Sequence, residues 1–395
     1  MRTGFGVKTP RPSASSSFLG ETLVTCGFPA ASVHQPSIRA QTTAHDVSIR
    51  SSTIDGADRR GWASHSMMDR RTFISGITLV ILAAPLAVEA QEAGKVWRIG
   101  YLDQGSAARS GSYVDGLRQG LRDLGWVEGR NIAIEVRFAE GRTDQLARLA
   151  AELVRLKMDL IVTSTTPAAL AAKHATTTIP IVIGFAADPV GSGIVASLAH
   201  PGGNITGWTH SGLELRAKYL ELLKEAVPEA TRVGVLWNPA NPVHRPSLKV
   251  IEGAAQRLKV ELHLAGVQDP KEIERAVSAL VGKGVQALVV FPDGMFQTQT
   301  PQILALAARH RLPALYGLRE YAELGGLMAY GANIAEMHRQ LSASLVDKIL
   351  RGAQPAHLPV AQPTEFDLLI NLKTAKALGL TIPESLLLRA NRVIE

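Results

Sequence analysis

From Val96 onward, short apolar runs rich in β-branched residues alternate with segments whose apolar residues recur at helical spacing. Ile132–Val136 and Leu160–Val162 are of the first kind, and Leu146–Leu156 is of the second. Strands that alternate with helices in this way form parallel sheets covered by helices on both faces. We therefore predict an α/β protein built from doubly wound, Rossmann-like parallel sheets.

The 395 residues suffice for two domains of ordinary size. The turn Pro201–Asn204 separates two series of strand and helix patterns, so the first lobe is expected over residues 96–206 and the second over 207–331. A helix near 334–350 is expected to return to the first lobe. The tail, 351–395, is expected to pack on the lobes, although spacing leaves open on which one.

The N-terminal part has a different composition. Residues 1–67 are rich in Ser, Thr and Arg without apolar periodicity, which predicts disorder or an upstream extension from a wrongly assigned start. Residues 68–90 have the basic, apolar and small-residue regions of a cleaved signal peptide, with an uncleaved membrane anchor as the alternative. The pair Arg70-Arg71 also resembles a twin-arginine export signal.

Charge and cysteine content restrict the partners and the chemistry. The net charge is +7, of which the first 90 residues carry +3, and no dense Lys/Arg run occurs after them. A nucleic-acid partner is therefore not expected, because it requires a clustered basic face. The only cysteine, Cys26, lies in the N-terminal extension, so the mature chain would have no disulfide, cysteine nucleophile or cysteine metal site.

The segment Ile179–Gly207 contains the most informative strand end. Its run Ile181–Ile183 predicts a strand buried on both faces, and Asp188 follows shortly after it. Ligands of parallel α/β sheets bind beyond the carboxyl ends of the strands, and two such sheets leave a cleft between them. Polar residues that follow strands are therefore the candidate ligand-binding residues: Ser106, Ser164, Thr165, Asp188, Asn238, Asp293, Tyr316 and Tyr330.

Each candidate also has a purely structural interpretation. Ser164-Thr165-Thr166-Pro167 predicts a helix start whose free N–H groups suit a carboxylate, yet an ordinary N-cap has the same sequence. Asp188 could pair with a ligand amine or cap a helix beginning near Gly191 and running through Leu198. Asn238 could bind a ligand or belong to a plain turn. Tyr316 and Tyr330 could contact a ligand or be core aromatics.

No catalytic or cofactor motif accompanies these candidates. The sequence lacks a phosphate-binding GxxxxGK[ST], a GxGxxG after the first strand, a GxSxG elbow and an HExxH pair. No metal or cofactor is predicted. These absences favour a binding protein over an enzyme.

Three separated blocks carry a family resemblance: DPVGSGIVASLAHPGGNITG, GGLMAYGANIAEMHRQLSASLVDKILRGAQPAHLPV and INLKTAKALGLTIPESLLLRANRVIE. They resemble the ABC-transporter substrate-binding proteins of the TrpX-like group, which are type 1 periplasmic binding proteins. The resemblance implies two lobes joined by about three crossings, no catalysis, and delivery of a ligand to an inner-membrane permease with its ATPase. It places pocket residues at Ser106, Ser164, Thr165, Asp188, Asn238 and Asp293. Members are linked to aromatic amino acids or have no known ligand.

The predicted function is therefore capture of a small organic solute in the periplasm by closure of two lobes around it. Two alternatives stay open, a ligand-sensing protein that signals to a membrane receptor and an α/β enzyme acting in the cleft. A transcription regulator is disfavoured by the export signal.

Overall fold

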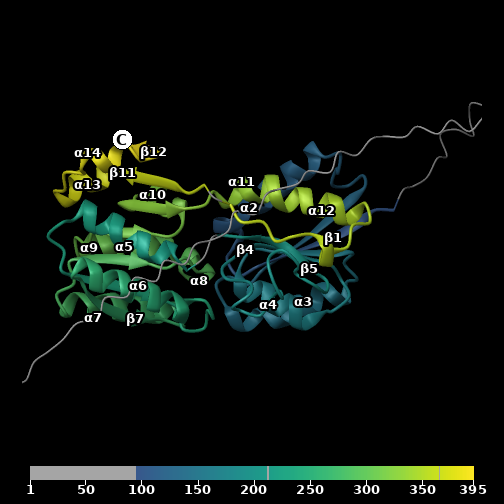
Figure 1. Ribbon diagram of the computed structural model, residues 1–395, viewed down its shortest axis with the longest axis horizontal. Helices are drawn as coiled ribbons and strands as arrows, with labels where there is room; N and C mark the ends of the chain where they lie inside the picture. Colours follow the sequence, from purple (N-terminus) through teal and green to yellow (C-terminus); the bar gives the residue numbers. More distant parts are fainter. Residues whose placement is uncertain (1–94, 211–212, 364) are drawn as a thin grey trace, which may run out of the picture. The chain divides into compact units, whose positions relative to one another are not determined.

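The structure, a computed structural model, describes residues 95–210, 213–363 and 365–395, all within one compact unit (Figure 1). The predictions for residues 1–67 and for the signal peptide at 68–90 lie outside the described residues. Across the described ranges, no helix combines the length and the apolar character that a membrane span requires.

The first lobe is a five-stranded sheet in the order β2-β1-β3-β4-β5, and every neighbouring pair is parallel. Its strands are β1 (Trp97–Asp103), β2 (Ile132–Phe138), β3 (Leu160–Thr163), β4 (Ile181–Ala186) and β5 (Ile205–Thr209). Its helices are α2 (Ala107–Asp123), η1 (Thr143–Gln145), α3 (Leu146–Arg155) and α4 (Thr166–Ala175). The predicted doubly wound sheet is confirmed. β5 pairs with β4, so the chain leaves this lobe after Thr209, slightly later than the predicted boundary at 206.

The helix predicted from Gly191 to Leu198 is wrong. This segment is a series of turns, in which Gly193 has a φ of +71° and the Ala196 N–H donates to the Pro201 carbonyl rather than to a helical partner. Ile194 and Val195 are buried, so the apolar residues that suggested a helix cover the sheet from an irregular chain. Glycine at a left-handed position breaks the helical ladder.

The second lobe is a seven-stranded sheet in the order β12-β11-β10-β9-β8-β6-β7. Its strands are β6 (Arg232–Trp237), β7 (Glu261–Gly266), β8 (Ala287–Val290), β9 (Ala314–Tyr316), β10 (Met328–Gly331), β11 (Asp367–Asn371) and β12 (Arg392–Ile394). Its helices are α5 (Leu215–Ala226), α6 (His244–Leu258), η2 (Pro270–Glu272), α7 (Ile273–Gly282), α8 (Gly294–Thr298), α9 (Thr300–Arg309), α10 (Arg319–Glu323), α13 (Leu372–Leu378) and α14 (Glu384–Leu387). The sheet is parallel except at β10 and β11, which are antiparallel.

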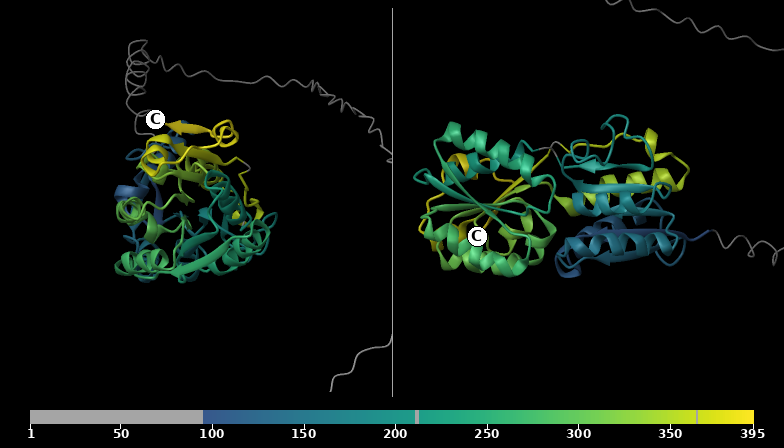
Figure 2. Two further views of the ribbon diagram at one scale, coloured as in Figure 1. Left: turned by 90° about the vertical axis from the view of Figure 1, so that its left-hand side faces the viewer. Right: turned by 90° about the horizontal axis from the view of Figure 1, so that it is seen from below.

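Helices cover both faces of each sheet (Figure 2). In the second lobe, α5 and α6 pack on the face that contains Val233 and Val235, while α7 and α9 pack on the face that contains Leu236 and Leu288. Successive strand residues point to opposite faces, so a strand with two covered faces is apolar throughout. This is why the strands read as continuous apolar runs.

The returning helix packs on α2. It runs from Ile334 to Leu350 as α11 (Ile334–Met337), a π-helical turn (His338–Ser342) and α12 (Ala343–Leu350). Gly116 and Gly120 of α2 face the backbone carbonyls of Ala335 and Arg339, so a Cβ atom at either glycine would collide with the returning helix.

The tail contacts the first lobe and contributes two strands to the second. The Ala361 N–H donates to the Gly207 carbonyl, and the Thr209 N–H donates to the Ala361 carbonyl. A short turn, η4 (Pro355–His357), precedes this contact with β5, and β11 and β12 then complete the second sheet. The chain therefore crosses between the lobes three times, after β5, after β10 and before β11, as the family resemblance implies.

Candidate functional site

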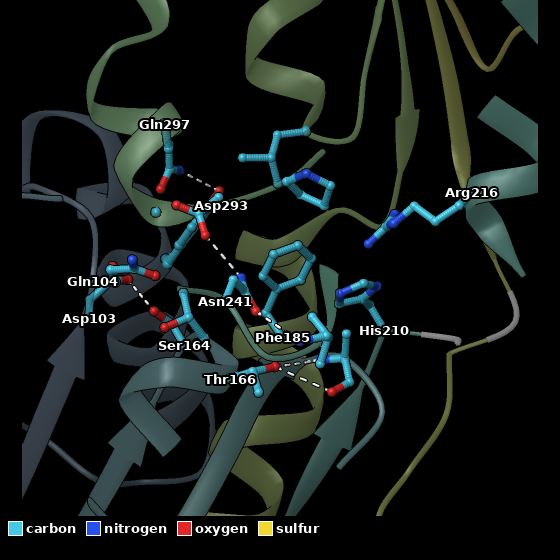
Figure 3. A pocket seen from close by; sticks show the side chains of 17 residues that line it. Asp103, Gln104, Ser164, Thr166, Phe185, His210, Arg216, Asn241, Asp293 and Gln297 are labelled. Atoms are coloured by element: carbon cyan, nitrogen blue, oxygen red, sulfur yellow. Dashed lines mark hydrogen bonds between the residues drawn. The ribbon is translucent and has the colours of Figure 1, made fainter. Parts of the chain in front are cut away.

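A cavity lies between the lobes, beyond the carboxyl ends of β1, β3, β4 and β8 (Figure 3). It holds about 440 Å³ of space outside the atoms, part of it open to solvent. Its lining residues are Asp103, Gln104, Tyr113, Ser164, Thr165, Thr166, Phe185, Ala187, His210, Arg216, Asn241, Val243, Pro292, Asp293, Gly294, Gln297 and Leu318.

Asp103 is the last residue of β1 and contributes a buried carboxylate to this cavity. The Ser164 hydroxyl and the Gly105 N–H donate hydrogen bonds to it, and the Ser110 hydroxyl lies 3.4 Å from its Oδ1 atom. Burial raises the pKa of Asp103, and the hydrogen bonds from Ser164, Gly105 and Ser110 oppose that rise. A carboxylate held in this way still has room to accept a hydrogen bond from a ligand cation.

Asp293 supplies a second buried carboxylate from the other lobe. Asn238 and Asn241 donate side-chain hydrogen bonds of 3.1 Å and 2.9 Å to its two oxygens, and the Met295 N–H donates at 3.0 Å. Asn238 and Asn241 come from the loop that follows β6, so the turn formers of this loop fix the orientation of Asp293. The two lobes thus each present a carboxylate to one cavity.

Arg216, on α5, is the cation of the cavity and is only 1% exposed. Its Nη1 atom donates to the Tyr219 hydroxyl at 2.7 Å, and its guanidinium lies 4.9 Å and 5.1 Å from the ring centroids of Tyr219 and Phe291. Among the described residues, no carboxylate forms an ion pair with Arg216, and its Nε atom is buried without a hydrogen-bond partner. Buried cations normally have a paired anion, so a negatively charged group of a ligand could pair with Arg216 here.

Gln104, in the first lobe, also lines the cavity and, like Arg216, has a buried side-chain atom without a hydrogen-bond partner among the described residues (Figure 3). Its Nε2 atom donates to the Thr143 hydroxyl at 2.8 Å, which fixes the amide orientation. Its Oε1 atom is buried and accepts no hydrogen bond from the described residues. Two residues that line the cavity therefore each have a buried side-chain atom, one acceptor and one donor, without a hydrogen-bond partner in the part of the chain that the structure describes.

The segment Ser164–Pro167 begins α4, as predicted. Thr165 is the N-cap, and its hydroxyl accepts from the Ala168 N–H at 3.3 Å. The Thr166 hydroxyl accepts from the Ala187 N–H at 3.0 Å, which ties the helix start to the loop after β4. The helix start therefore borders the cavity, with Ser164 committed to Asp103.

Phe185 is brought into the cavity by an irregularity in β4. The pairing of β4 with β5 shifts register between Ile183 and Ala186, and Phe185 has a φ of +48°. A left-handed backbone is unfavourable for a bulky residue and is concentrated at functional sites. Its half-buried ring stacks on His210 with centroids 4.4 Å apart, so the two rings form an aromatic wall.

Of the sequence-predicted site residues, Ser164, Thr165 and Asp293 line the cavity, and Asn238 lies behind it as a donor to Asp293. The other four lie elsewhere, for physical reasons. Ser106 is the N-cap of α2. Asp188 has a φ of +41°, and its Oδ1 atom accepts from the Gly191 N–H in a turn that borders a different surface hollow.

The two predicted tyrosines belong to the packing of the second lobe. Tyr316 is buried and stacks on Tyr321 with ring centroids 4.4 Å apart. Tyr330 packs edge-on against Tyr219 and contacts Phe366. The core-aromatic interpretation therefore describes both positions.

The cavity residues that sequence reasoning missed include Asp103, Gln104, Phe185, His210, Arg216, Asn241 and Gln297. Asp103 and Gln104 obey the strand-end rule, but β1 runs one residue further than its apolar pattern. Arg216 lies within the first turn of a helix, where no strand-end rule applies. In the part of the chain that the structure describes, no three His, Cys, Asp or Glu side chains come together as a metal site would require.

Two helix-covered, mostly parallel sheets joined by three crossings, with a polar cavity between them, have the architecture of the type 1 periplasmic-binding-protein fold. A family model, "ABC transporter substrate binding protein", matches residues 108–394, and the chain belongs to this family. The chain is 30% identical over 265 residues to the tyrosine-binding protein of Clostridioides difficile (strain R20291), covering 67% of this chain and 76% of that protein.

Two solved structures are similar in both sequence and fold. One is the crystal structure of an ABC domain from Streptococcus pneumonia in complex with L-Trp, with 26% identity, a TM-score of 0.71, and coverage of 76% of this chain and 100% of that one. The other is the ligand-free, open structure of a substrate-binding protein with adhesive properties from Clostridium difficile. It shows 28% identity, a TM-score of 0.55, and coverage of 76% and 99%.

Proposed function

We propose that this protein is the substrate-binding component of an ABC importer and that it binds an α-amino acid between its lobes. The observation that carries the proposal is the pair of unsatisfied buried atoms in one cavity, the Arg216 Nε donor and the Gln104 Oε1 acceptor. Leaving a buried polar group unpaired costs about 1–3 kcal/mol, and more for a charged one. A ligand that satisfies both atoms recovers that cost.

An α-amino acid has the complementary groups. Its carboxylate would accept hydrogen bonds from the Arg216 guanidinium, which has no anionic partner among the described residues. Its ammonium would donate to Gln104 Oε1 and to the carboxylates of Asp103 and Asp293. A cation that contacts both carboxylates would link the two lobes and so favour their closure.

The apolar part of the lining indicates the kind of side chain that the ligand carries. Phe185 and His210 form an aromatic wall, and Val243, Pro292 and Leu318 complete an apolar surface. Offset stacking of aromatic rings adds about 0.5–1.5 kcal/mol beyond the burial of area. Together with the tyrosine and L-Trp of the two relatives, this lining supports an aromatic amino acid as the ligand.

Binding would operate by closure of the lobes about the three crossings. In support, the chain superposes better on the L-Trp complex than on the ligand-free, open relative, at nearly equal identity and coverage. A ligand that contacts both lobes stabilises the closed form by its differential affinity for it. The closed form would then deliver the ligand, without turnover, to a membrane permease driven by an ATPase. Export through the predicted signal peptide would place the protein in the periplasm.

A thermal-shift screen of the purified protein tests the proposal. The panel contains the twenty amino acids, simple sugars and dicarboxylic acids, and the matched variant is Arg216→Met. We expect L-tryptophan or L-tyrosine to raise the Tm of the wild type, because a ligand that binds only the folded state stabilises it. The variant should show no shift. A shift with sugars alone, or equal shifts in both proteins, would refute the proposed ligand.

A further inference from the structure

Gln297, on α8 of the second lobe, makes its side-chain hydrogen bonds with the first lobe. Its Oε1 atom accepts from the Ser110 hydroxyl at 3.1 Å. Its Nε2 atom donates to the Tyr113 hydroxyl at 2.8 Å and to the Arg109 carbonyl at 3.4 Å. All three partners belong to α2, so one side chain of one lobe is bonded to the first helix of the other.

Tyr113 extends this connection to a second element of the second lobe. Its hydroxyl donates to Glu320 Oε1, on α10, at 3.0 Å while accepting from Gln297. The single hydroxyl hydrogen is used once and the oxygen lone pair once, so the donor and acceptor roles of these bonds are compatible. Two elements of the second lobe, α8 and α10, are thus linked through one tyrosine of the first.

The backbone of α8 also fits closely against the first lobe. A Cβ atom on Gly294 would collide with the side chain of Gln104, and one on Gly141 would collide with Thr298. Gly141 has a φ of +79°, a conformation that glycine adopts freely. Gly294 therefore allows α8 to approach the loop after β1, and Gly141 allows the loop after β2 to approach α8.

Gln297 lines the cavity, but its polar atoms differ from those of Gln104 and Arg216. Both ends of its amide are used by Ser110, Tyr113 and Arg109, whereas Gln104 and Arg216 each keep a buried atom without a partner. A side chain whose hydrogen bonds are already made has little left to offer a ligand. Its contacts exist only when the two lobes are together.

We infer that Gln297 is a positioning residue that bonds α8 to α2 and thereby sets the closing equilibrium of the lobes, independently of which ligand is bound. The inference rests on the proposed function, because a closing equilibrium matters here through ligand capture. The apparent affinity of any ligand scales with the population of the binding-competent form. Loss of the Gln297 bonds therefore weakens every ligand by one common factor and also separates the lobes of the ligand-free protein, whereas loss of a contact with the variable side chain of the ligand changes the ranking of ligands.

The test compares wild type, Gln297→Leu and Gln299→Leu by titration calorimetry with L-tryptophan and L-tyrosine. Gln299 is the matched control, since the side-chain hydrogen bond of this glutamine is to Thr298 in its own lobe. We expect Gln297→Leu to weaken both ligands by the same factor, roughly 5- to 50-fold for the loss of two or three hydrogen bonds. Gln299→Leu should leave both affinities within about twofold of wild type.

A second variant tests the coupling of Gln297 to α2. Ser110 does not line the cavity, but its hydroxyl donates to Gln297 at 3.1 Å and also lies 3.4 Å from Asp103, so Ser110→Ala should weaken both ligands by one common factor. In a Gln297→Leu background its effect should be smaller than in the wild type, because only the contact with Asp103 is left to lose. A loss confined to one ligand, or full additivity of the two substitutions, would overturn the inference.

A ligand-free measurement keeps this inference distinct from the proposed function. Spin labels at Arg148→Cys and Arg275→Cys, both exposed and in different lobes, report the separation of the lobes in a Cys26→Ser background. We expect Gln297→Leu to move the distance distribution toward longer separations. If no amino acid binds the wild type, the proposed function fails, and the ligand-free distance measurement alone decides the inference about Gln297. Identical distance distributions in wild type and Gln297→Leu would refute that inference.

Discussion

The Arg216 guanidinium donates a 2.7 Å hydrogen bond to the Tyr219 hydroxyl and lies over the Tyr219 ring. This pair lies within one turn of α5, so Tyr219 holds the cation at the cavity without neutralising it. Arg216 is thus a fixed, buried positive charge, and we propose that the ligand supplies its anion. That division of charge is the basis of the proposed amino-acid specificity.

Arg216→Met should remove binding while sparing the fold. We expect the affinity for L-tryptophan and L-tyrosine to fall about 100-fold or more, near 3 kcal/mol, because the ligand carboxylate loses its buried partner. The ligand-free protein should unfold at the same temperature or higher, since an unpaired buried cation is removed. Titration calorimetry and thermal unfolding measure the two effects. A large fall in Tm with unchanged affinity would make Arg216 a structural residue.

Asp103→Asn should weaken the same ligands by about 10- to 1,000-fold, because a neutral amide attracts an ammonium less than a carboxylate does. Asp188→Asn is the matched control and should bind like wild type, as Asp188 lies outside the cavity. Burial raises the pKa of Asp103, so the wild-type affinity should decline on acidification at a higher pH than an ordinary aspartate would give. Titrations at several pH values check both points, and equal losses in the two variants would contradict the assignment.

Phe185→Ala should change specificity more than stability. Loss of the ring removes the wall shared with His210, so aromatic amino acids should bind about 3- to 10-fold more weakly through lost stacking alone, with lost burial adding to this. Small amino acids, if they bind, should be little affected. The left-handed backbone at this position persists with Ala, so Phe185→Gly, which relieves the strain, is the comparison for stability. Equal losses for aromatic and small ligands would argue against a stacking wall.

Acid should destabilise the protein below pH 6.5 through two buried histidines. Burial lowers the pKa of His338 to about 3 and that of His244 to about 4. Between these values and pH 6.5, the unfolded chain binds protons that the folded protein does not, so stability falls as the pH decreases. From pH 6.5 to pH 5 each histidine should remove about 2 kcal/mol.

Denaturant unfolding at pH 6.5, 5.75 and 5 measures this slope. His338→Gln, which cannot titrate, should remove about half of the histidine contribution. A stability that is flat over this range in the wild type would show that the two rings are solvated or protonated in the folded state.

The pattern of strands and helices could be predicted because the apolar residues along each element mark the faces that are buried. β4 reads as apolar because both its faces are covered, and α2 carries glycines where the returning helix approaches. The helix predicted after Gly191 failed because its apolar residues are buried from turns rather than from one helical face. Periodicity cannot separate those two cases over so short a segment.

The cavity was predicted only in part, because the position of a strand end does not fix the direction of its side chain. Thr165 and Asp293 line the cavity. Phe185 and Asp188 have positive φ angles, and the Phe185 ring lines the cavity whereas the Asp188 carboxylate caps a turn outside it. Arg216 lies on α5, the first helix after the chain crosses from the first lobe to the second. Whether its side chain lies at the cavity depends on how the two lobes are arranged, and no local sequence pattern predicts that arrangement.

The most direct test of the account is calorimetric titration of the wild-type protein with L-tryptophan and L-tyrosine, alongside tryptamine and indole-3-propionate, which lack the carboxylate and the amine respectively. The account predicts that at least one of the two amino acids binds with a Kd near the micromolar range, about −8 kcal/mol. It predicts that both analogues bind at least about 100-fold more weakly, since each leaves a buried charge unpaired. Failure of both amino acids to bind, or analogues that bind as tightly as L-tryptophan, would contradict it.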